Sequence, residues 1–309
     1  MKGPPLRLQG LADAVLTDPT LAATLGDIES VDALDLTGPA GLRPFVVKGL
    51  ADRGRTVLAV TATQREAEDL VESLADLVDA DTVGYFPSWE TLPHERLSPR
   101  SDTIGRRLAV LRRIVHPEEG ELRVVVAPVR SLLQPQVKGL GDLTPVLLHP
   151  GDTVDLDDLG RRLSDAAYTR VDLVEKRGEY AVRGGIVDVF PPTEEHPVRI
   201  EFWGDDVEEI RTFAVADQRT LATVDRLWAP PCRELLLTDD VRRRAAELGA
   251  EHPQLAELTE KIAQGIAVEG MESLAPALVD EMELLVDLMP KDTHVLLLDP
   301  ERARSRAHD

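Results

Sequence analysis

Residues 179–220 read EYAVRGGIVDVFPPTEEHPVRIEFWGDDVEEIRTFAVADQRT and carry the clearest β-sheet pattern in the chain. The pattern predicts three antiparallel strands joined by short polar turns. Pro191-Pro192 ends the first apolar run, because proline has no backbone N–H to donate to a sheet. Gly204-Asp205-Asp206 is a turn signal that separates the two later strands.

One face of this predicted sheet is apolar and the other is charged. Side chains alternate along a strand, so the apolar residues of 198–203 share one face: Val198, Ile200 and Phe202. Arg199, Glu201 and Trp203 then fall on the opposite face. A face with both signs of charge and an aromatic residue suits the docking of another protein.

Composition predicts an ordinary soluble globular protein. The chain has 309 residues, of which 43% are apolar and 29% charged, and this length suits two or three domains. No apolar run approaches the roughly 20 residues of a membrane-spanning helix, and the N-terminus MKGPPLRLQG lacks the apolar core of a signal peptide. The single cysteine, Cys232, excludes an intrachain disulfide, so we expect a cytoplasmic protein with an incidental free thiol.

The net charge of −21 argues against a chain that holds nucleic acid by itself, because it repels phosphate backbones. The nearest basic cluster is the arginine-rich segment Arg96–Arg113. Helical spacing spreads most of these arginines around the solvent side of an amphipathic helix. We therefore predict a solvated helix face rather than a DNA clamp.

The first 130 residues alternate between predicted strands and helices. Thr63 and Glu66 form a capping box that opens one helix, and Ser101 can cap another. The predicted strands are 31–36, 56–61, 83–86 and 124–127. Apolar strands separated by helices indicate a parallel sheet that is covered on both faces.

The pattern changes in the middle of the chain. Residues 134–225 contain loops, a short helix at 157–167 and the β-rich stretch, which together predict a small inserted α+β domain. A later apolar strand, Val295–Leu298, is interpreted as a buried strand that can rejoin the first sheet. We therefore predict one α/β domain in two halves, residues 1–133 and 226–309, interrupted by the inserted domain.

The turn after the first predicted strand stands where a phosphate loop would be but lacks its chemistry. Such a loop needs glycines, a lysine for the β and γ phosphates and a hydroxyl for magnesium. Gly38 and Gly41 are present, but Gly41 or Leu42 stands in place of the lysine and no serine or threonine follows. Arg43 can supply a charge with a different geometry. We predict a plain strand-to-helix turn, and nucleotide binding through Arg43 is the alternative.

No other pattern predicts catalysis, a metal site or a cofactor. No serine sits in a nucleophile elbow, the histidines form no HxxxH pair, and no Cys/His cluster suits zinc. Asp299 follows an apolar strand as a magnesium-binding acid would, but without a partner lysine it is interpreted as a strand end.

Several motifs together resemble the N-terminal region of bacterial transcription-repair coupling factors. The resemblance covers nearly the whole chain, and the combination is far more specific than any one motif. The motifs are YFPSWETLP at 85–93, SP at 98–99, IGRRL at 104–108, GEYAVRGG at 178–185, DVFP at 188–191 and DQRT at 217–220.

The resemblance implies a module similar to the first domains of the damage-verification protein UvrB, namely domains 1a, 2 and 1b. Those domains have a helicase-like fold related to P-loop NTPases, split in two by the inserted domain, and in the coupling factors the phosphate loop is degenerate. The implied function is non-catalytic: to mimic UvrB and recruit UvrA, the damage-recognition ATPase, linking stalled transcription to nucleotide excision repair. The resemblance also implies that this chain is an N-terminal fragment of a DNA translocase. ATP, magnesium, RNA polymerase and DNA would be bound by regions outside it.

The resemblance assigns docking roles to individual residues. Arg170 and Arg183 align with arginines that the family uses to bind UvrA, and Arg199 and Glu201 match the charged pair of the Arg-Ile-Glu-Phe strand. Ala181 departs from UvrB, which tends to have an arginine there.

Geometry alone allows Arg183 to join this charged face. A bulge at Gly184-Gly185 would shift the parity of the strand and bring Arg183 beside Arg199 and Glu201. The plain alternative is that Arg183 and Glu201 form a cross-strand pair worth about 0.2–1 kcal/mol.

Two other functions remain open at this point. One is half of an ATP-dependent helicase or NTPase whose unusual phosphate loop uses Arg43. The other is a restraint on the absent motor domains, which would mask the docking face by an intramolecular contact.

Overall fold

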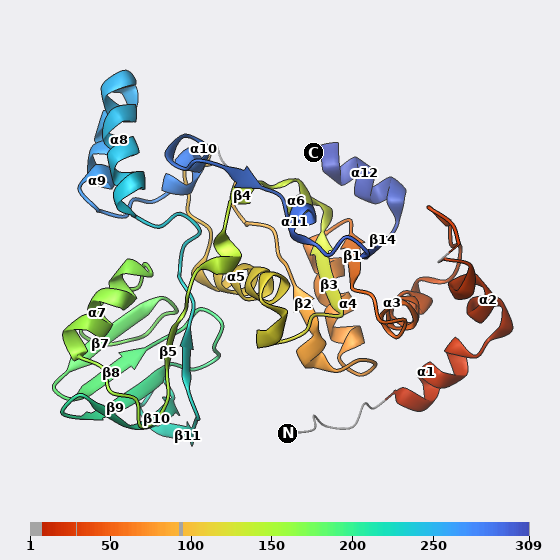
Figure 1. The fold of residues 1–309 in the computed structure, drawn as a ribbon, viewed down its shortest axis with the longest axis horizontal. Helices are drawn as coiled ribbons and strands as arrows, with labels where there is room; N and C mark the ends of the chain where they lie inside the picture. The colour runs from red at the N-terminus through yellow and green to blue at the C-terminus, as the bar shows by residue number, and fades with distance from the viewer. Residues whose placement is uncertain (1–7, 29, 93–94, 309) are drawn as a thin grey trace. The chain divides into compact units, whose positions relative to one another are not determined.

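The computed structural model describes residues 8–28, 30–92 and 95–308, and the chain divides into two compact units. The first unit comprises residues 1–88, 110–135 and 284–309, and the second comprises residues 89–109 and 136–283. The division falls inside helix α5 (Ser101–Val115). Each unit is built around its own sheet (Figure 1).

The first unit contains a four-stranded parallel sheet in the order β14-β1-β3-β2. Its strands are β1 (Val57–Thr61), β2 (Val83–Tyr85), β3 (Val124–Pro128) and β14 (His294–Leu297). Every residue of β1 and β3 is buried, as expected for central strands covered on both faces. The parallel sheet is confirmed, and so is the return of a C-terminal strand to it.

Helices cover this sheet. They are α1 (Gln9–Leu16), α2 (Pro19–Asp27), α3 (Arg43–Ala51), α4 (Gln64–Leu74), α6 (Val129–Leu133), α11 (Leu285–Leu288) and α12 (Pro300–His308). The predicted capping box opens α4: the Thr63 hydroxyl accepts from the Glu66 amide, and the Glu66 carboxylate accepts from the Thr63 amide at 3.1 Å. Ala67, Leu70 and Leu74 on its inner face are buried in the core of this unit.

Two predicted features of the first unit are wrong. Residues 31–36 form no strand, and the side chains of Val31, Leu34 and Leu36 are exposed. The acids that separate these apolar residues leave too little apolar surface to hold a strand in a buried sheet. The strand near 295–298 does pair with β1, but it is an edge strand rather than a buried one, and Val295 is 65% exposed.

The second unit contains a six-stranded sheet in the order β11-β10-β9-β8-β7-β6. The strands are β6 (Thr169–Arg170), β7 (Glu179–Arg183), β8 (Ile186–Val189), β9 (Val198–Trp203), β10 (Asp206–Phe213) and β11 (Thr220–Thr223). All neighbours are antiparallel except β6 and β7, which are parallel. The stretch 179–220 thus contains four antiparallel strands, β7 to β10, rather than the predicted three, and β11 begins at its last residue.

The extra strand arises because Gly184-Gly185 is a two-residue hairpin turn between β7 and β8, not the predicted bulge. Arg183 pairs directly with Ile186 across the turn. Gly184 has a φ of +59°, which favours glycine, and a Cβ on Gly185 would lie 2.9 Å from the carbonyl oxygen of Phe202. Both positions therefore require glycine for the turn.

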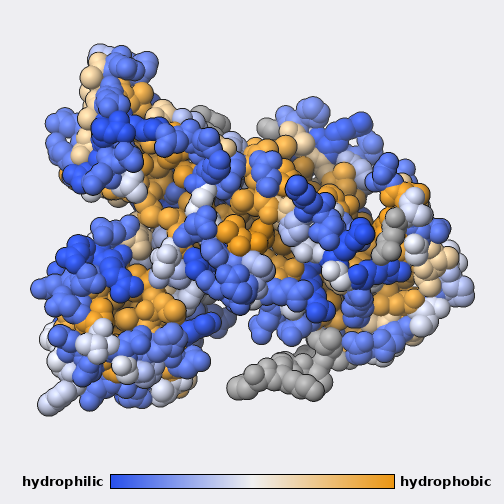
Figure 2. Space-filling view, viewed as in Figure 1, coloured by the Kyte–Doolittle hydropathy of each residue, from blue (hydrophilic) through white to orange (hydrophobic). Residues whose placement is uncertain are grey.

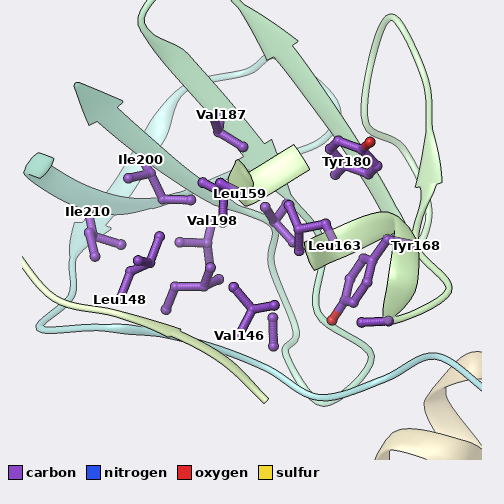
Figure 3. Close-up of a cluster of buried hydrophobic side chains, with 14 of the residues drawn as sticks. Val146, Leu148, Leu159, Leu163, Tyr168, Tyr180, Val187, Val198, Ile200 and Ile210 are labelled. Carbon is purple, nitrogen blue, oxygen red and sulfur yellow. The ribbon is translucent and has the colours of Figure 1, made fainter. Parts of the chain in front are cut away.

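The apolar face of this sheet packs on helix α7 (Leu156–Asp165) and on the paired strands β5 (Val146–Leu148) and β12 (Leu227–Ala229). Figure 3 shows Leu159 and Leu163 of α7 pointing toward Val187 and Val198 of the sheet. The alternation predicted for 198–203 is confirmed, since Val198, Ile200 and Phe202 are buried while Trp203 is exposed.

The rest of the second unit is mostly helical. Helices α8 (Asp239–Glu251) and α9 (Ala256–Ala263) pack side by side, and α10 (Ala275–Leu278) joins their apolar core (Figure 1). The short strands β4 (Gln136–Val137) and β13 (Met282–Glu283) pair with each other. The compact unit at 136–283 therefore extends beyond the predicted inserted domain at 134–225, whose boundaries remain a prediction.

One arginine of the segment Arg96–Arg113 contradicts the predicted solvated face. Arg107 is 0% exposed, and its Nε donates to Glu234 Oε1 at 2.5 Å. Its Nη2 donates to Gln136 Oε1 at 3.1 Å. Arg107 therefore lies inside the second unit as one half of a buried ion pair.

Candidate protein-docking face

The charged face of the six-stranded sheet is built by two rows of side chains that cross the strands. We call it the docking face and define it by Arg183, Asp188, Arg199, Glu201, Glu209 and Arg211. In one row Asp188 lies opposite Arg199, which lies opposite Arg211. In the other row Arg183 pairs with Ile186, Ile186 with Glu201, and Glu201 with Glu209. The hairpin register thus places Arg183 on the face of Arg199 and Glu201.

Asp188 holds the two arginines of this face together. It is 1% exposed, and Arg183 Nη2 donates to its Oδ2 at 2.6 Å. Arg199 donates to the same carboxylate twice, from Nε to Oδ1 at 2.7 Å and from Nη2 to Oδ2 at 2.8 Å. Such a two-pronged arginine–carboxylate contact fixes orientation as well as charge.

Arg199 is the more deeply fixed of the two arginines. Its guanidinium lies 4.5 Å from the centre of the Phe213 ring, and its Nη2 also donates to Gln218 Oε1 at 3.2 Å. Hydrogen bonding to Asp188 raises the pKa of Arg199. Arg183 keeps 46% of its side chain exposed, so Arg183 is the arginine that can reach a partner.

Glu201 forms its ion pair with Arg211 and not with Arg183. Arg211 donates to Glu201 and also lies 3.6 Å from Glu209. The cross-strand ion pair between Arg183 and Glu201 is therefore replaced by two separate contacts, Arg183 with Asp188 and Arg211 with Glu201.

The docking face is bipolar as a result. Arg183 of β7 and Arg199 of β9 share the one carboxylate of Asp188 in β8, which leaves a net positive charge on this group. One arginine serves two glutamates on the side of β9 and β10, which leaves a net negative charge. A partner must present charges in the opposite order, and such complementarity favours specificity and fast association.

Arg170 does not join these residues. It lies in the edge strand β6, opposite Tyr180, whose side chain is buried in the core on the other face of the sheet. Arg170 is exposed at this edge. Its register position therefore separates it from the row of Arg183, although the two residues belong to neighbouring strands.

The loop at Gly38, Gly41 and Leu42, which the sequence compares with a phosphate loop, lies in the first unit. Gly38 and Gly41 are exposed and Leu42 is half-buried, in a loop and 3-10 turn that precede α3. A hollow opens beside them at the C-terminal end of β1, lined by Ala40, Arg43, Pro44, Thr61, Glu66, Asp69, Leu70, Ser73 and Leu298.

The charges of this hollow are unsuited to phosphate. Glu66 and Asp69 contribute carboxylates to its lining, and Arg302 of α12 donates to Glu66 at 2.5 Å. Lys48 of α3 is buried and bonds Asp52 at 3.0 Å, so it holds a carboxylate of its own helix. Only Arg43 brings a positive charge among the lining residues.

Cys232 lies in the hydrophobic core beneath the six-stranded sheet, where burial raises the pKa of its thiol to about 12. The thiolate is the nucleophilic form, so a thiol with this pKa is inert at neutral pH. The interpretation of Cys232 as an incidental residue agrees with this position.

Comparison with known proteins decides the family. Residues 146–235 match the family model described as the UvrB interaction domain. A transcription-repair-coupling factor from Mycobacterium bovis is 49% identical over 318 residues, covering 98% of this chain and 26% of the relative. The corresponding proteins of Haemophilus influenzae and Escherichia coli are each 32% identical, over 81% and 65% of this chain and over 22% and 17% of their own lengths.

The chain belongs to the transcription-repair-coupling factor family. It corresponds to the N-terminal module of that family, as its motifs indicated. It spans about a quarter of the length of the M. bovis relative. Within the described ranges, no helix has both the length and the apolar character needed to cross a membrane.

Residues 146–235 of this chain, which match the UvrB interaction domain, contain the whole docking face. Figure 2 shows hydrophilic residues over much of the visible surface of the part that contains the six-stranded sheet, β6 to β11. The residue that sequence reasoning missed is Asp188. Its signal was a single acid inside the apolar run Ile186–Phe190, a position at which a buried charge needs a partner.

Proposed function

We propose that this module recruits the excision-repair protein UvrA through the docking face, in the manner of UvrB. The observation that carries the proposal is the coincidence of two findings. The UvrB interaction domain matches residues 146–235, and this segment carries an exposed arginine, Arg183, oriented by a buried carboxylate. The module would link stalled transcription to nucleotide excision repair, as part of a coupling factor whose other regions bind RNA polymerase and DNA.

The site residues of this proposal are Arg183, Arg199, Glu201 and Arg170. Arg183 is the direct contact, because Asp188 fixes its guanidinium while 46% of its side chain stays exposed. Arg199 acts through Asp188 and Phe213, and Glu201 belongs to the negative half of the face. Arg170 would meet the partner at the edge strand β6.

We further propose that the chain contains a degenerate helicase-like domain without catalytic activity, whose parallel sheet lies in the first unit. In this proposal residues 1–133 and 226–309 are domains 1a and 1b, and residues 134–225 are domain 2. A parallel sheet with a hollow at the end of β1 supports the helicase-like assignment. The acidic lining of that hollow and the absence of a lysine at Gly41 or Leu42 support the loss of nucleotide binding.

Nucleotide binding separates this proposal from the NTPase alternative. Titration with a fluorescent ATP analogue and magnesium is expected to show no saturable binding up to millimolar analogue, because Glu66 and Asp69 repel phosphate. The measurement is fluorescence anisotropy at equilibrium. Micromolar binding that Arg43→Ala abolishes would instead establish the enzyme alternative.

Arg183→Gln is expected to weaken UvrA binding about tenfold or more. Glutamine keeps a donor near Asp188 but loses the charge, and the Arg199 contact to Asp188 keeps the sheet folded. Calorimetric titration of UvrA into the module gives the two affinities. Arg183→Glu should weaken binding further, but it places a second carboxylate beside buried Asp188, so thermal unfolding must accompany it.

Arg161→Gln is the matched control, because Arg161 is an exposed arginine of α7, on the opposite side of the sheet. It should bind UvrA as the wild type does. Affinity should also fall with added salt, since exposed charges are screened over a Debye length of about 8 Å at physiological ionic strength. Equal affinities for wild type and Arg183→Gln would refute the assignment of Arg183.

The same face can be covered by other domains of a whole coupling factor, as the masking hypothesis holds. Masking predicts that the isolated module binds UvrA more tightly than the whole protein does. The two proteins can be compared in the same calorimetric titration.

A further inference from the structure

Trp203 is exposed to an extent that no other aromatic residue of this chain approaches. The chain has three tryptophans, three tyrosines and five phenylalanines, all within the described ranges. Among them Trp203 alone is exposed, with 77% of its surface accessible, and the rest are buried or half-buried. A bare indole ring at a strand end costs apolar burial that a stable fold would otherwise gain.

The sheet leaves this ring uncovered on both sides. Trp203 ends β9, one row beyond Glu201 on the face that carries Arg183 and Arg199. On the side of β8 the chain has turned at Gly184-Gly185, which brings no side chain, and a Cβ on Gly184 would contact nothing within 4 Å. On the side of β10 the residue directly opposite is Asp206.

The surroundings of the ring are acidic. Asp206 lies across the hairpin, Asp205 lies in the turn, and Glu201 lies two residues earlier on the same face. Arg183 lies two strands and one row away and is bonded to Asp188, and Arg211 lies one strand and two rows away, where it contacts Glu201 and Glu209. An aromatic face beside several carboxylates attracts a cation by the ring quadrupole and by charge together.

We propose that Trp203, with Asp205 and Asp206, is the receptor for a basic side chain, an arginine or lysine, of the docking partner. This inference rests on the proposed function, in which that partner is UvrA. It adds a second anchor to the face: an acidic group of the partner meets Arg183, and a basic group meets Trp203. The two anchors are separated by two strands and one row, on the order of 10 Å.

Three substitutions distinguish a cation receptor from a merely apolar contact. Trp203→Leu keeps apolar bulk but removes the aromatic face, and it should weaken UvrA binding about tenfold. Trp203→Phe keeps an aromatic face and should cost less than about threefold. Trp203→Ala should resemble Trp203→Leu. An apolar contact would instead let Trp203→Leu bind UvrA nearly as tightly as Trp203→Phe does.

Calorimetric titration of UvrA into each variant supplies the affinities, and circular dichroism with thermal unfolding shows that each variant is folded. Val295→Ala is the control, because Val295 is also an exposed apolar residue, 65% exposed, and lies in the first unit. It should bind as the wild type does. A second readout is 19F NMR of the module labelled with 5-fluorotryptophan, in which the Trp203 resonance should shift most when unlabelled UvrA is added.

The outcomes separate this inference from the function on which it rests. If the wild type binds UvrA, Arg183→Gln weakens binding and Trp203→Leu does not, the receptor is wrong and the docking face stands. If Trp203→Leu and Trp203→Phe weaken binding equally, the cation receptor is also wrong. If the wild type does not bind UvrA at all, the proposed function and this inference both fail.

Discussion

Arg107→Met is expected to destabilise the second unit by about 3–5 kcal/mol, the cost of removing one partner from a buried ion pair. The side chains of Arg107 and Glu234 are 0% and 2% exposed, so the glutamate would be left charged and unpaired in the interior. Trp89 Nε1 also donates to this carboxylate at 3.4 Å, and Gln136 Oε1 would lose the hydrogen bond that it accepts from Arg107 Nη2. Urea unfolding followed by circular dichroism measures the change.

Arg106→Met is the matched control, because Arg106 is the preceding residue of α5 and is exposed. Its substitution should change stability by no more than about 0.5 kcal/mol. The double variant Arg107→Met/Glu234→Leu should be less destabilised than the sum of the two single variants, since replacing both ions removes the unpaired charge. Equal stabilities for Arg107→Met and Arg106→Met would show that the pair does not form.

Asp188→Ala is expected to cost about 2–4 kcal/mol of stability and to weaken UvrA binding together with it. Three hydrogen bonds from Arg183 and Arg199 end on this carboxylate, and its removal leaves two neighbouring guanidinium groups without their anion. The estimate is lower than that for Arg107, because Arg183 is half exposed and water can solvate it. The stability and the UvrA affinity of Asp188→Asn should lie between those of the wild type and those of Asp188→Ala.

Glu208→Ala is the control for this prediction, because Glu208 is an exposed carboxylate of the same sheet. Thermal unfolding gives the stability, and titration with UvrA at a temperature where all variants are folded gives the affinity. If Asp188 holds Arg183 and Arg199 in place as a clamp, both the stability and the affinity change for Asp188→Ala and neither changes for Glu208→Ala. A stable Asp188→Ala variant with normal UvrA affinity would contradict the role of Asp188 in holding Arg183 and Arg199.

Features that depend on neighbouring residues were predictable from sequence. The capping box of Thr63 and Glu66 needs only a spacing of three residues, and it opens α4 as predicted. The alternation of Val198, Ile200 and Phe202 follows from strand geometry alone. Continuous apolar runs at β1 and β3 likewise indicated buried parallel strands, which the structure contains.

Features that depend on distant residues were not predictable in this way. Arg107 and Glu234 are separated by 127 positions, and helical periodicity placed most arginines of 96–113 on the solvent side without distinguishing Arg107. The segment 31–36 has the spacing of a strand but does not pair with the sheet. Gly184-Gly185 suits either a bulge or a turn, and the close approach of the Phe202 carbonyl to Gly185 is visible only in the folded sheet.

The candidate docking face shows the same division. Sequence alone determined that a charged face exists, that it carries Arg199, Glu201 and Trp203, and which family's motifs accompany it. Tertiary structure decided which charges meet: Asp188 takes Arg183 and Arg199, Arg211 takes Glu201, and Arg170 stands apart at the edge. The physical reason is that alternation along one strand is a local property of the backbone. The pairing of charges depends on the register between strands, and only the folded sheet sets that register.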